Sequence, residues 1–334
     1  MDPLSRNMSM SQLDKIKSPI RDEMKDFESY FRDSMKTSIP LLDVILNYIV
    51  RRKGKQMRPM FVFLTARMLG EINSSTYTAA SLIELLHNAT LIHDDVVDKS
   101  YRRRGHFSIN ALWKSKISVL VGDYLLSRGL LLSVRNKEYD LLEIVSHAVQ
   151  EMSEGELLQV RNSRKVYISE QEYFKVVRKK TASLIASCTA CGARSVSRDD
   201  GLIETMRDFG EKIGIAFQIK DDLLDYERSG TIGKPAGNDI KEKKVTLPLI
   251  YALNQASSKE KRDIKRIFGR SRKNGRQVTQ IIEFVRRHDG LGQARSKMEQ
   301  IRNEALQMLS PYASQNEGYN SLVELVDFTV NRTK

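Results

Sequence analysis

The sequence predicts an all-α fold, a single-domain bundle of about ten to thirteen helices. Proline is scarce, with seven residues among 334, and none occurs over residues 60–234. In that span apolar residues recur at three- and four-residue spacing, as at Leu82, Leu85 and Leu86, without strict apolar–polar alternation. This is the helical period, and an interior proline would interrupt it. No Ser/Gly-rich linker or shift in composition divides the chain, so one domain over residues 1–334 is expected.

Turn signals separate the predicted helices. Gly54, Gly105 and Gly233 each lie in a short polar segment that is typical of a turn. Pro59 falls where a helix tolerates proline best, in its first turn. The predicted helices cover residues 10–35, 38–53, 59–70, 75–99, 108–135, 138–163, 169–197, 200–227, 245–256, 259–272, 276–288, 291–309 and 319–331.

The composition is typical of a globular protein in water, with 40% hydrophobic and 29% charged residues. The sequence has no run of about eighteen uncharged apolar residues, so no membrane-spanning segment is predicted. The N-terminus lacks the apolar core of a secretory signal, and we therefore expect a cytoplasmic location. Residues 1–10 carry no periodic pattern and are expected to be disordered or a leader.

The net charge of +13, from 55 basic and 42 acidic residues, points to an anionic partner. No segment interleaves basic and aromatic residues as a surface that reads bases would, so nucleic acid is not expected. Anionic small molecules and an anionic membrane surface both stay open. Charge alone does not decide between them, and the basic residues from Lys261 to Arg276 leave a membrane-surface role open as an addition.

The two cysteines, Cys188 and Cys191, form a C-x-x-C pair. Redox or metal chemistry is one interpretation, but no second pair and no neighbouring histidine completes a site. We therefore predict two small apolar residues on a buried helix face.

Two aspartate-rich motifs each end a long apolar stretch, and segments 82–98 and 209–225 resemble each other weakly. The motifs read H-D-D-V-V-D at 93–98 and K-D-D-L-L-D at 220–225. Residues four apart share a helix face, so Asp94 can act with Asp98, and Asp221 with Asp225. Clustered carboxylates favour a cation, and Mg²⁺ typically takes one or two carboxylates plus phosphate oxygens. One copy would be typical of a solvated helix end, but two copies predict a metal-dependent phosphate site.

Basic residues near both motifs supply candidate anion-binding groups. Lys55 and Arg58 stand at the beginning of a predicted helix, where backbone N–H groups also favour anions. Further basic positions are Arg102 to Arg104, Lys180 before Thr181, Lys234, and Lys241 to Lys244. Each alone is typical of a solvated surface. Together they predict two anion pockets, one bridged by metal and one purely basic.

With these motifs in order, the chain resembles the trans-type polyprenyl (isoprenyl) diphosphate synthase family, in its long-chain, hexa- to octaprenyl branch. The resemblance runs from Gly54 to Lys334 through G-K-Q-M-R-P, H-D-D-V-V-D, R-R-G, G-D-Y-L-L, K-T-A, F-Q-I-K-D-D-L-L-D and G-K-P-A-G-N-D-I. No single motif is decisive, but the ordered set is specific. It implies an isoprenoid synthase-like helical bundle around a large central cavity, and a homodimer.

The resemblance also implies roles for individual residues. A cluster of Mg²⁺ ions, about three with the allylic diphosphate bound, would be held by Asp94, Asp95, Asp98, Asp221, Asp225 and, more weakly, Asp222. The allylic diphosphate would contact Arg103, Lys180, Lys234 and Lys244. Isopentenyl diphosphate would be held without metal by Lys55, Arg58, His87 and Arg104. The reaction centre would be lined by Thr181 and Gln218, whose oxygens support the carbocation.

Two of these assignments have alternatives. Lys243 stands where many relatives carry glycine, so either Lys243 or Lys244 could make the diphosphate contact. His87 could be a core histidine. It lies seven residues before Asp94 and thus on the same helix face, which favours the binding role.

The expected reaction is Mg²⁺-assisted ionisation of an allylic diphosphate, farnesyl or geranylgeranyl diphosphate, followed by attack of the isopentenyl double bond. A proton is then lost to the released diphosphate. Product length should be set sterically, because each helical turn rises about 5.4 Å, close to one isoprene unit. The positions along this ruler are Ala89, Thr90, Leu86, Leu85 and Leu82.

Relatives with short products resemble one another in a bulky aromatic residue at the position of Ala89 or Thr90. The small residues here predict a long all-trans product of about six to eight units, about C30–C40. The floor of the tunnel could lie near Leu126 or Leu130. A long apolar product would also give a reason for peripheral membrane contact during release.

Three alternatives remain. A short-chain farnesyl or geranylgeranyl diphosphate synthase would share every motif. A class I terpene cyclase shares the first aspartate motif but lacks the second and needs no G-K-x-x-R-P site. A non-catalytic partner subunit or helical scaffold would be expected to have lost motif aspartates, and none is lost here.

Overall fold

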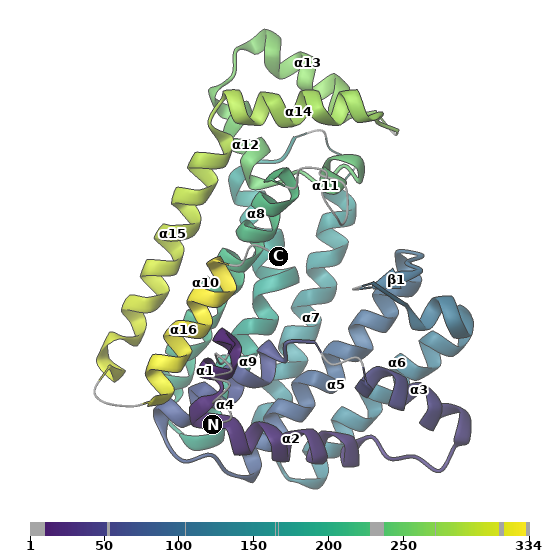
Figure 1. The fold of residues 1–334 in the computed structure, drawn as a ribbon, viewed down its shortest axis with the longest axis vertical. Coiled ribbons are helices and arrows are strands. Elements are labelled where there is room, and N and C mark those ends of the chain that lie inside the picture. The colour runs from purple at the N-terminus through teal and green to yellow at the C-terminus, as the bar shows by residue number, and fades with distance from the viewer. Residues whose placement is uncertain are drawn as a thin grey trace, which may run out of the picture. The chain divides into compact units, whose positions relative to one another are not determined.

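The computed structural model describes residues 11–51, 54–103, 105–163, 165, 167–227, 237–270, 272–313 and 317–331 (Figure 1). These residues are mostly helical, which confirms the predicted all-α class. The first eight α-helices are α1 (Gln12–Ile16), α2 (Arg21–Ser34), α3 (Pro40–Arg51), α4 (Met57–Leu69), α5 (Ser74–Val97), α6 (Ile109–Arg135), α7 (Tyr139–Asn162) and α8 (Glu170–Val177). The later ones are α9 (Ser183–Val196), α10 (Asp200–Glu227), α11 (Asn238–Lys241), α12 (Leu247–Gln255), α13 (Ser258–Phe268), α14 (Gly275–Arg287), α15 (Gly290–Leu309) and α16 (Glu317–Asn331).

Most predicted boundaries lie within a few residues of these, but two long helices are interrupted. The single helix predicted over 10–35 was wrong, because Ser18–Ile20 form a 3₁₀ turn that contains Pro19. Proline lacks the N–H that a continuous helix needs there. The helix predicted over 169–197 contains a π turn, Arg178–Ala182, between α8 and α9. A second 3₁₀ turn covers Ser310–Tyr312.

Two small elements were not predicted. Arg102–Arg103 (β1) pairs antiparallel with His106–Phe107 (β2) in a two-residue ladder. Gly105, with φ of 81°, supplies the left-handed residue in the turn between them. The short α11 also escaped prediction, since four residues are too few to show helical periodicity.

The chain divides into two compact units. The first unit comprises residues 1–145, 188–203 and 311–325, and the second comprises 146–187, 204–310 and 326–334. Helices α7, α9, α10 and α16 each have residues in both units. Each unit has its own apolar core.

In the first unit, α5 lies along α6 (Figure 1). Their shared core also takes in α3, and its buried members are Met35, Ile45, Leu46, Leu85, Ala89, Ile92, Ile109, Val121 and Leu125. A glycine on α6 permits this close packing. A Cβ added to Gly129 would lie 3.2 Å from Leu82 Cδ1 and 3.6 Å from Leu86 Cδ2.

The second unit has two apolar clusters. One joins α8, α10, α12 and α15 through residues such as Tyr173, Ile219, Ile250 and Met298. The other joins the end of α10 to α12, α13 and α14, with Tyr226 and Phe268 among its fully buried members. Figure 1 shows α13 and α14 as the green helices that follow α12. These clusters fix the end of α10, where the second aspartate motif lies.

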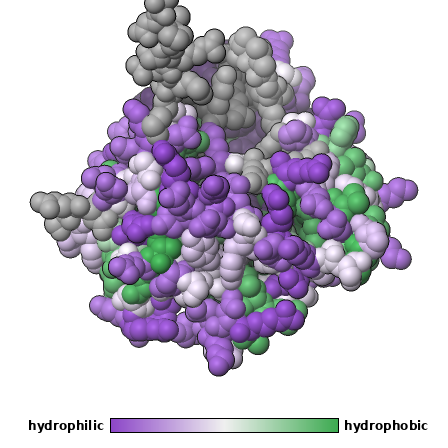
Figure 2. Space-filling view, turned by 60° about the horizontal axis from the view of Figure 1, so that its bottom comes forward, coloured by the Kyte–Doolittle hydropathy of each residue, from purple (hydrophilic) through white to green (hydrophobic). Residues whose placement is uncertain are grey.

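Helix α6 keeps a largely apolar face on the surface. Its large exposed apolar residues are Leu112, Val119, Leu120, Leu130, Leu131 and Val134. Among the described residues, α6 is the one helix that is long and apolar enough to cross a membrane, a test that core helices of soluble proteins also pass. Figure 2 shows separate apolar patches within a mainly hydrophilic face of the molecule.

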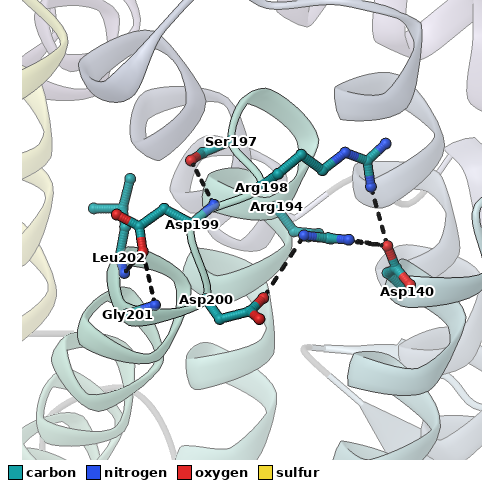
Figure 3. A network of polar contacts seen from close by, with 8 residues as sticks. All are labelled: Asp140, Arg194, Ser197, Arg198, Asp199, Asp200, Gly201 and Leu202. Carbon is teal, nitrogen blue, oxygen red and sulfur yellow. Dashed lines mark hydrogen bonds and ion pairs between the residues drawn. The ribbon is translucent and has the colours of Figure 1, made fainter.

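A polar network in the first unit fixes the beginning of α7 to the connection between α9 and α10 (Figure 3). Asp140 accepts hydrogen bonds from Arg194 Nε and Arg198 Nη1, each at 3.0 Å. The Arg194 hydrogen bond lowers the pKa of the Asp140 carboxyl. Asp199 accepts bonds from two backbone N–H groups in the first turn of α10. Asx capping of this kind marks where α10 begins.

Candidate active site

The first aspartate motif ends α5 in the first unit. Asp98 is the C-terminal cap residue, and its backbone N–H donates to the Asp94 carbonyl at 2.8 Å. Asp94 is half-buried and Asp98 is exposed, whereas Asp95 is only 4% exposed. The helical arrangement places Asp94 and Asp98 one turn apart on one face, as predicted. Asp95 points elsewhere, into the protein.

A glycine on α6 accommodates the histidine that begins this motif. A Cβ added to Gly122 would lie 2.2 Å from His93 Nε2. The same nitrogen is 3.3 Å from the Val119 carbonyl oxygen and 3.4 Å from Asp123 Oδ1. Gly122 and Asp123 belong to the G-D-Y-L-L motif. That motif therefore anchors the end of α5 immediately before its aspartates.

Three of the four residues predicted to hold isopentenyl diphosphate lie on α4, on α5 and in the loop before α4. Arg58 Nε donates to Glu84 Oε1 on α5 at 2.9 Å, and both side chains are largely buried. Lys55 is exposed. His87 is 9% exposed. Since α4 packs against α5, Arg58 and His87 stand on neighbouring helices, whereas Arg104 lies outside the described residues.

The predicted ruler positions are packed within the first unit. Ala89 and Leu85 are fully buried in the cluster shared by α3, α5 and α6. Thr90 is half-buried, and its hydroxyl donates to the His87 carbonyl at 2.9 Å. Of the two floor candidates, Leu126 packs against the same cluster, whereas Leu130 is 47% exposed. Their roles in chain length stay predictions.

The second aspartate motif ends α10 in the second unit, and its Asp222 and Asp225 carboxylates accept hydrogen bonds from within the protein. Asp222 accepts hydrogen bonds from Tyr173 Oη at 2.7 Å, Gln218 Nε2 at 3.0 Å and the Leu247 backbone N–H at 3.3 Å. Burial raises the pKa of Asp222 to about 7, although the hydrogen bond from Gln218 acts in the opposite direction. Asp222 is 3% exposed.

Asp225 has a different internal role. Its two carboxylate oxygens accept from the backbone N–H groups of Asn238 and Asp239, each at 3.1 Å. It thereby caps α11 and holds the segment that leads to Lys243 and Lys244. Asp221 is half-buried. The metal-binding roles predicted for Asp221, Asp222 and Asp225 stay predictions.

A cavity of about 200 Å³ lies within the second unit. It brings together six residues predicted from the sequence, namely Lys180, Thr181, Gln218, Asp222, Lys243 and Lys244. Its wall also contains Gln159, Asn162, Tyr173 and Asp239, which the sequence did not single out. Asp239 stands inside the G-K-P-A-G-N-D-I motif, so that motif carried a signal for it. Burial, with the nearby Asp225 carboxylate, raises the pKa of Asp239 to about 6.

A chain of hydrogen bonds orients the polar wall of this cavity. Thr181 Oγ1 donates to Gln218 Oε1 at 2.9 Å. Gln218 Nε2 in turn donates to Asp222, which also accepts from Tyr173. The Gln218 amide is thus held at both ends, and the Thr181 hydroxyl hydrogen is used in the bond to Gln218 Oε1. Its lone pairs are left for a positive charge in the cavity.

Lys180 and Lys244 in the cavity wall each have a nearby acidic partner. Lys180 pairs with Glu156 on α7, and Lys244 Nζ is 2.6 Å from Glu242 Oε2. Lys243 adopts a left-handed φ of 59°, a conformation that glycine adopts without strain. This gives a physical reason for the glycine that the family resemblance leads us to expect at that position. Lys234 and the Arg103 side chain lie outside what the structure describes.

The carboxylates fit a metal that is bound together with its substrate. Within the described residues, no group of three or more His, Cys, Asp or Glu side chains is arranged to hold an ion. Mg²⁺ commonly takes only one or two protein carboxylates and completes its shell with water and phosphate oxygens. Asp94 and Asp98, one turn apart, offer this kind of donor set.

Cys188 and Cys191 are fully buried in α9, which confirms the predicted core position. Burial raises the pKa of the Cys188 thiol well above its ordinary value. A protonated buried thiol is a poor nucleophile and metal ligand.

Comparisons with known proteins give one matching family profile and several similar proteins. The polyprenyl synthetase family profile matches residues 39–285. The octaprenyl diphosphate synthase of Escherichia coli is 33% identical over 299 residues, which cover 89% of this chain and 92% of that protein. Among solved structures, a Caulobacter crescentus polyprenyl synthase with calcium and isoprenyl diphosphate is 32% identical, with a TM-score of 0.87 over 96% of this chain and 98% of that chain. A geranylgeranyl pyrophosphate synthase from Bacteroides thetaiotaomicron is 36% identical, with a TM-score of 0.82 over 97% and 100%.

Proposed function

Because the chain belongs to the polyprenyl synthetase family, we propose that it extends farnesyl or geranylgeranyl diphosphate with isopentenyl diphosphate. The enzyme is a prenyltransferase, and the proposed product is an all-trans polyprenyl diphosphate of about six to eight isoprene units by the helix-rise ruler. The observation that carries this proposal is the cavity of the second unit. In it Lys180, Thr181, Gln218 and Lys244 converge as the reaction requires.

Mg²⁺ is the proposed cofactor. Its candidate ligands are Asp94 and Asp98 in the first unit and, considered separately, Asp221 in the second unit. When bound, it neutralises charge on the diphosphate leaving group and so favours ionisation of the allylic C–O bond. Carboxylate oxygens are the donors that Mg²⁺ prefers. The internal hydrogen bonds of Asp222 and Asp225 support a secondary role for these two residues, and the number of ions is proposed to be about three.

The chain's own residues perform the remaining work. Lys180 and Lys244 bind the allylic diphosphate and stabilise the charge that develops on it. Thr181 and Gln218 present oxygen atoms to the developing allylic cation, and Asp222 holds the Gln218 amide in orientation. Lys55, Arg58 and His87 bind isopentenyl diphosphate. The double bond of isopentenyl diphosphate attacks the cation. The condensed product then loses a proton to the released diphosphate.

The long product is supported by the small residues at the ruler positions. Ala89 and Thr90 stand where a bulky aromatic residue would end the tunnel early. The relatives include an octaprenyl and a geranylgeranyl synthase, so family membership alone does not select the length. A short-chain synthase is therefore the second candidate function.

A homodimer is proposed from the exposed face of α6. Its six large exposed apolar side chains would be removed from water by a second copy of the helix, at about 25 cal/mol for each Å² buried. We place the enzyme in the cytoplasm. Sedimentation equilibrium should give a mass of twice the chain, and Leu120→Glu with Leu131→Glu should reduce it to that of the monomer.

Peripheral contact with anionic membrane is proposed for α13, α14 and the residues between them. Residues 257–289 contain eleven Lys and Arg against four Asp and Glu, more than half of the chain's net charge. No large exposed hydrophobic residue is described on this segment, so the contact would be electrostatic and sensitive to salt. Such a surface would keep the enzyme close to the bilayer that receives an apolar product.

The proposed reaction is tested by incubating the purified protein with Mg²⁺, farnesyl diphosphate and labelled isopentenyl diphosphate. Label should enter an acid-labile, butanol-extractable product, and EDTA should abolish it. Release of a cyclic hydrocarbon from geranylgeranyl diphosphate alone would identify a terpene cyclase instead. Failure to incorporate label or to form hydrocarbon, with the fold intact, would indicate a non-catalytic partner subunit.

A further inference from the structure

The segment that carries Lys180 and Thr181 is not an ordinary helix. In the π turn Arg178–Ala182, the Ser183 N–H donates to the Arg178 carbonyl, five residues earlier. An α-helix would make this bond four residues earlier. The extra residue changes the direction in which the side chains of the turn point, and π turns occur frequently at functional sites. Since the sequence pattern here is that of a continuous helix, the turn needs a physical cause.

Two glycines leave space for the backbone of this turn. On α7, a Cβ added to Gly155 would lie 2.5 Å from the Lys180 backbone nitrogen and 2.8 Å from its Cα. On α10, a Cβ added to Gly214 would lie 2.5 Å from Ala182 Cα and 2.8 Å from its Cβ. Backbone atoms cannot rotate aside as the end of a flexible side chain can. Any larger residue at either glycine must therefore displace the turn.

Side-chain contacts align the turn between the same two helices. Lys179 Nζ lies 2.7 Å from Glu154 and 3.3 Å from Glu151, both on α7. Arg178 Nε lies 3.4 Å from Glu211 on α10. These ion pairs are partly exposed and individually weak. They indicate the orientation of the turn, while the close backbone approach at the glycines fixes its distance from α7 and α10.

We propose that Gly155 and Gly214 are positioning residues for the transfer reaction. By admitting the π turn against α7 and α10, they direct Lys180 and Thr181 into the cavity of the second unit. The 2.9 Å hydrogen bond from Thr181 to Gln218 depends on this placement. The inference rests on the proposed function, since it assigns the two glycines to the same cavity.

A purely structural role predicts a different pattern of effects. If the glycines served only to pack the helices, alanine would lower the melting temperature and leave the turnover of the folded fraction unchanged. A positioning role predicts a lower kcat in protein that is still folded. A displacement of about 1 Å at a reacting group can reduce the rate by about a hundredfold.

The first experiment compares Gly155→Ala and Gly214→Ala with Gly275→Ala at the beginning of α14. An added Cβ at Gly275 meets nothing within 4 Å, so it is the matched control. We expect kcat to fall by about ten- to a hundredfold in the two test variants. In the two test variants, the KM for isopentenyl diphosphate should stay within about twofold of wild type. The kcat and KM of Gly275→Ala should stay within the same range, as is ordinary for surface substitutions. A kcat within about twofold of wild type in both folded variants would overturn the proposal.

A double-mutant cycle tests whether Gly214 acts through Thr181. Thr181→Val keeps the shape of the side chain but removes the hydroxyl, and it should lower kcat on its own. Combined with Gly214→Ala, the total loss should be clearly smaller than the product of the two single losses, because coupled sites are not additive. Independent, multiplying losses would contradict the inference.

Thr181→Val also covers the case in which the alanine variants do not fold. Full kcat in this variant would show that the reaction does not depend on where the turn places the Thr181 hydroxyl, and would overturn the proposal. Failure of the proposed function is a separate result, because wild-type protein would then incorporate no isopentenyl diphosphate.

Discussion

The two aspartate motifs share one sequence pattern but differ in what their carboxylates contact. At the end of α5, the last aspartate, Asp98, is exposed and stands at the helix terminus. At the end of α10, the corresponding Asp225 is 9% exposed and accepts two backbone hydrogen bonds from the beginning of α11. The middle aspartates, Asp95 and Asp222, are buried in both motifs.

Spacing alone therefore does not distinguish a metal ligand from a structural carboxylate. Four-residue spacing places the first and last aspartates on one helix face in both cases. The segment after each helix then determines which hydrogen bonds the last aspartate accepts. The first helix is succeeded by a short hairpin, and the second by a segment whose backbone N–H groups return to Asp225. Substitutions at both motifs and in the segment after α10 can test this asymmetry.

Asp98→Ala should have the largest effect on activity and little on stability. Removing a carboxylate that is proposed to bind Mg²⁺ should lower kcat by about a hundredfold or more. The side chain is exposed, so the free energy of unfolding should change by less than about 0.5 kcal/mol. Activity as a function of Mg²⁺ concentration, measured beside urea unfolding, checks both. A stability loss that accounts for the lost activity would contradict this assignment.

Asp225→Ala should show the reverse balance. Two backbone N–H groups lose their acceptor, which should lower the free energy of unfolding by about 1–3 kcal/mol. The Mg²⁺ concentration for half-maximal rate should stay close to that of wild type. Urea unfolding and a Mg²⁺ titration of the rate are the measurements. An unchanged stability with a large shift in the Mg²⁺ requirement would make Asp225 a principal ligand.

Asp222→Asn should change how stability depends on pH. The pKa of Asp222 is raised from 3.8 to about 7 in the folded state, chiefly by burial. The folded protein therefore binds more protons than the unfolded chain between these values, and its stability falls as the pH rises from about 4 to about 7. The variant should lack this part of the decline. The free energy of unfolding of both proteins is measured in EDTA from about pH 4 to about pH 8. If it changes with pH equally in the two proteins, the prediction is contradicted.

Lys243→Gly should have the smallest effect, a gain in stability of about 1 kcal/mol. Glycine adopts the left-handed conformation of this residue without the Cβ clash that a lysine incurs. Lys243→Ala is the control, because it removes the same charge but keeps the Cβ. A higher melting temperature in the glycine variant alone supports the conformational explanation. Equal changes in both variants would assign the effect to charge.

Much of the fold could be predicted from the sequence because its helices are long and strongly periodic. The span of α10, predicted over 200–227, was confirmed at both ends. The π turn could not be predicted, because Arg178–Ala182 follows the same periodicity as its neighbours. Its cause lies in Gly155 and Gly214, which meet it only in the folded protein.

The candidate site was predictable to a similar degree. The motifs identified the lysines, Thr181 and Gln218, which the structure places around one cavity. They did not identify Tyr173 or Asp239, whose proximity to Asp222 and Asp225 arises from packing rather than spacing. Nor could the pattern reveal that Asp225 caps α11, since that contact depends on how the chain returns after α10.

The proposed function is tested most directly by the size of the product that the wild-type enzyme makes. Protein, Mg²⁺, farnesyl diphosphate and excess labelled isopentenyl diphosphate are incubated, and the dephosphorylated chains are separated by chromatography. We expect a ladder that ends at about six to eight isoprene units, and a shorter ladder for Ala89→Phe, from the rise of one turn per unit. A wild-type ladder that stops at about three or four units would contradict the long-chain assignment, and the absence of any ladder would contradict the reaction itself.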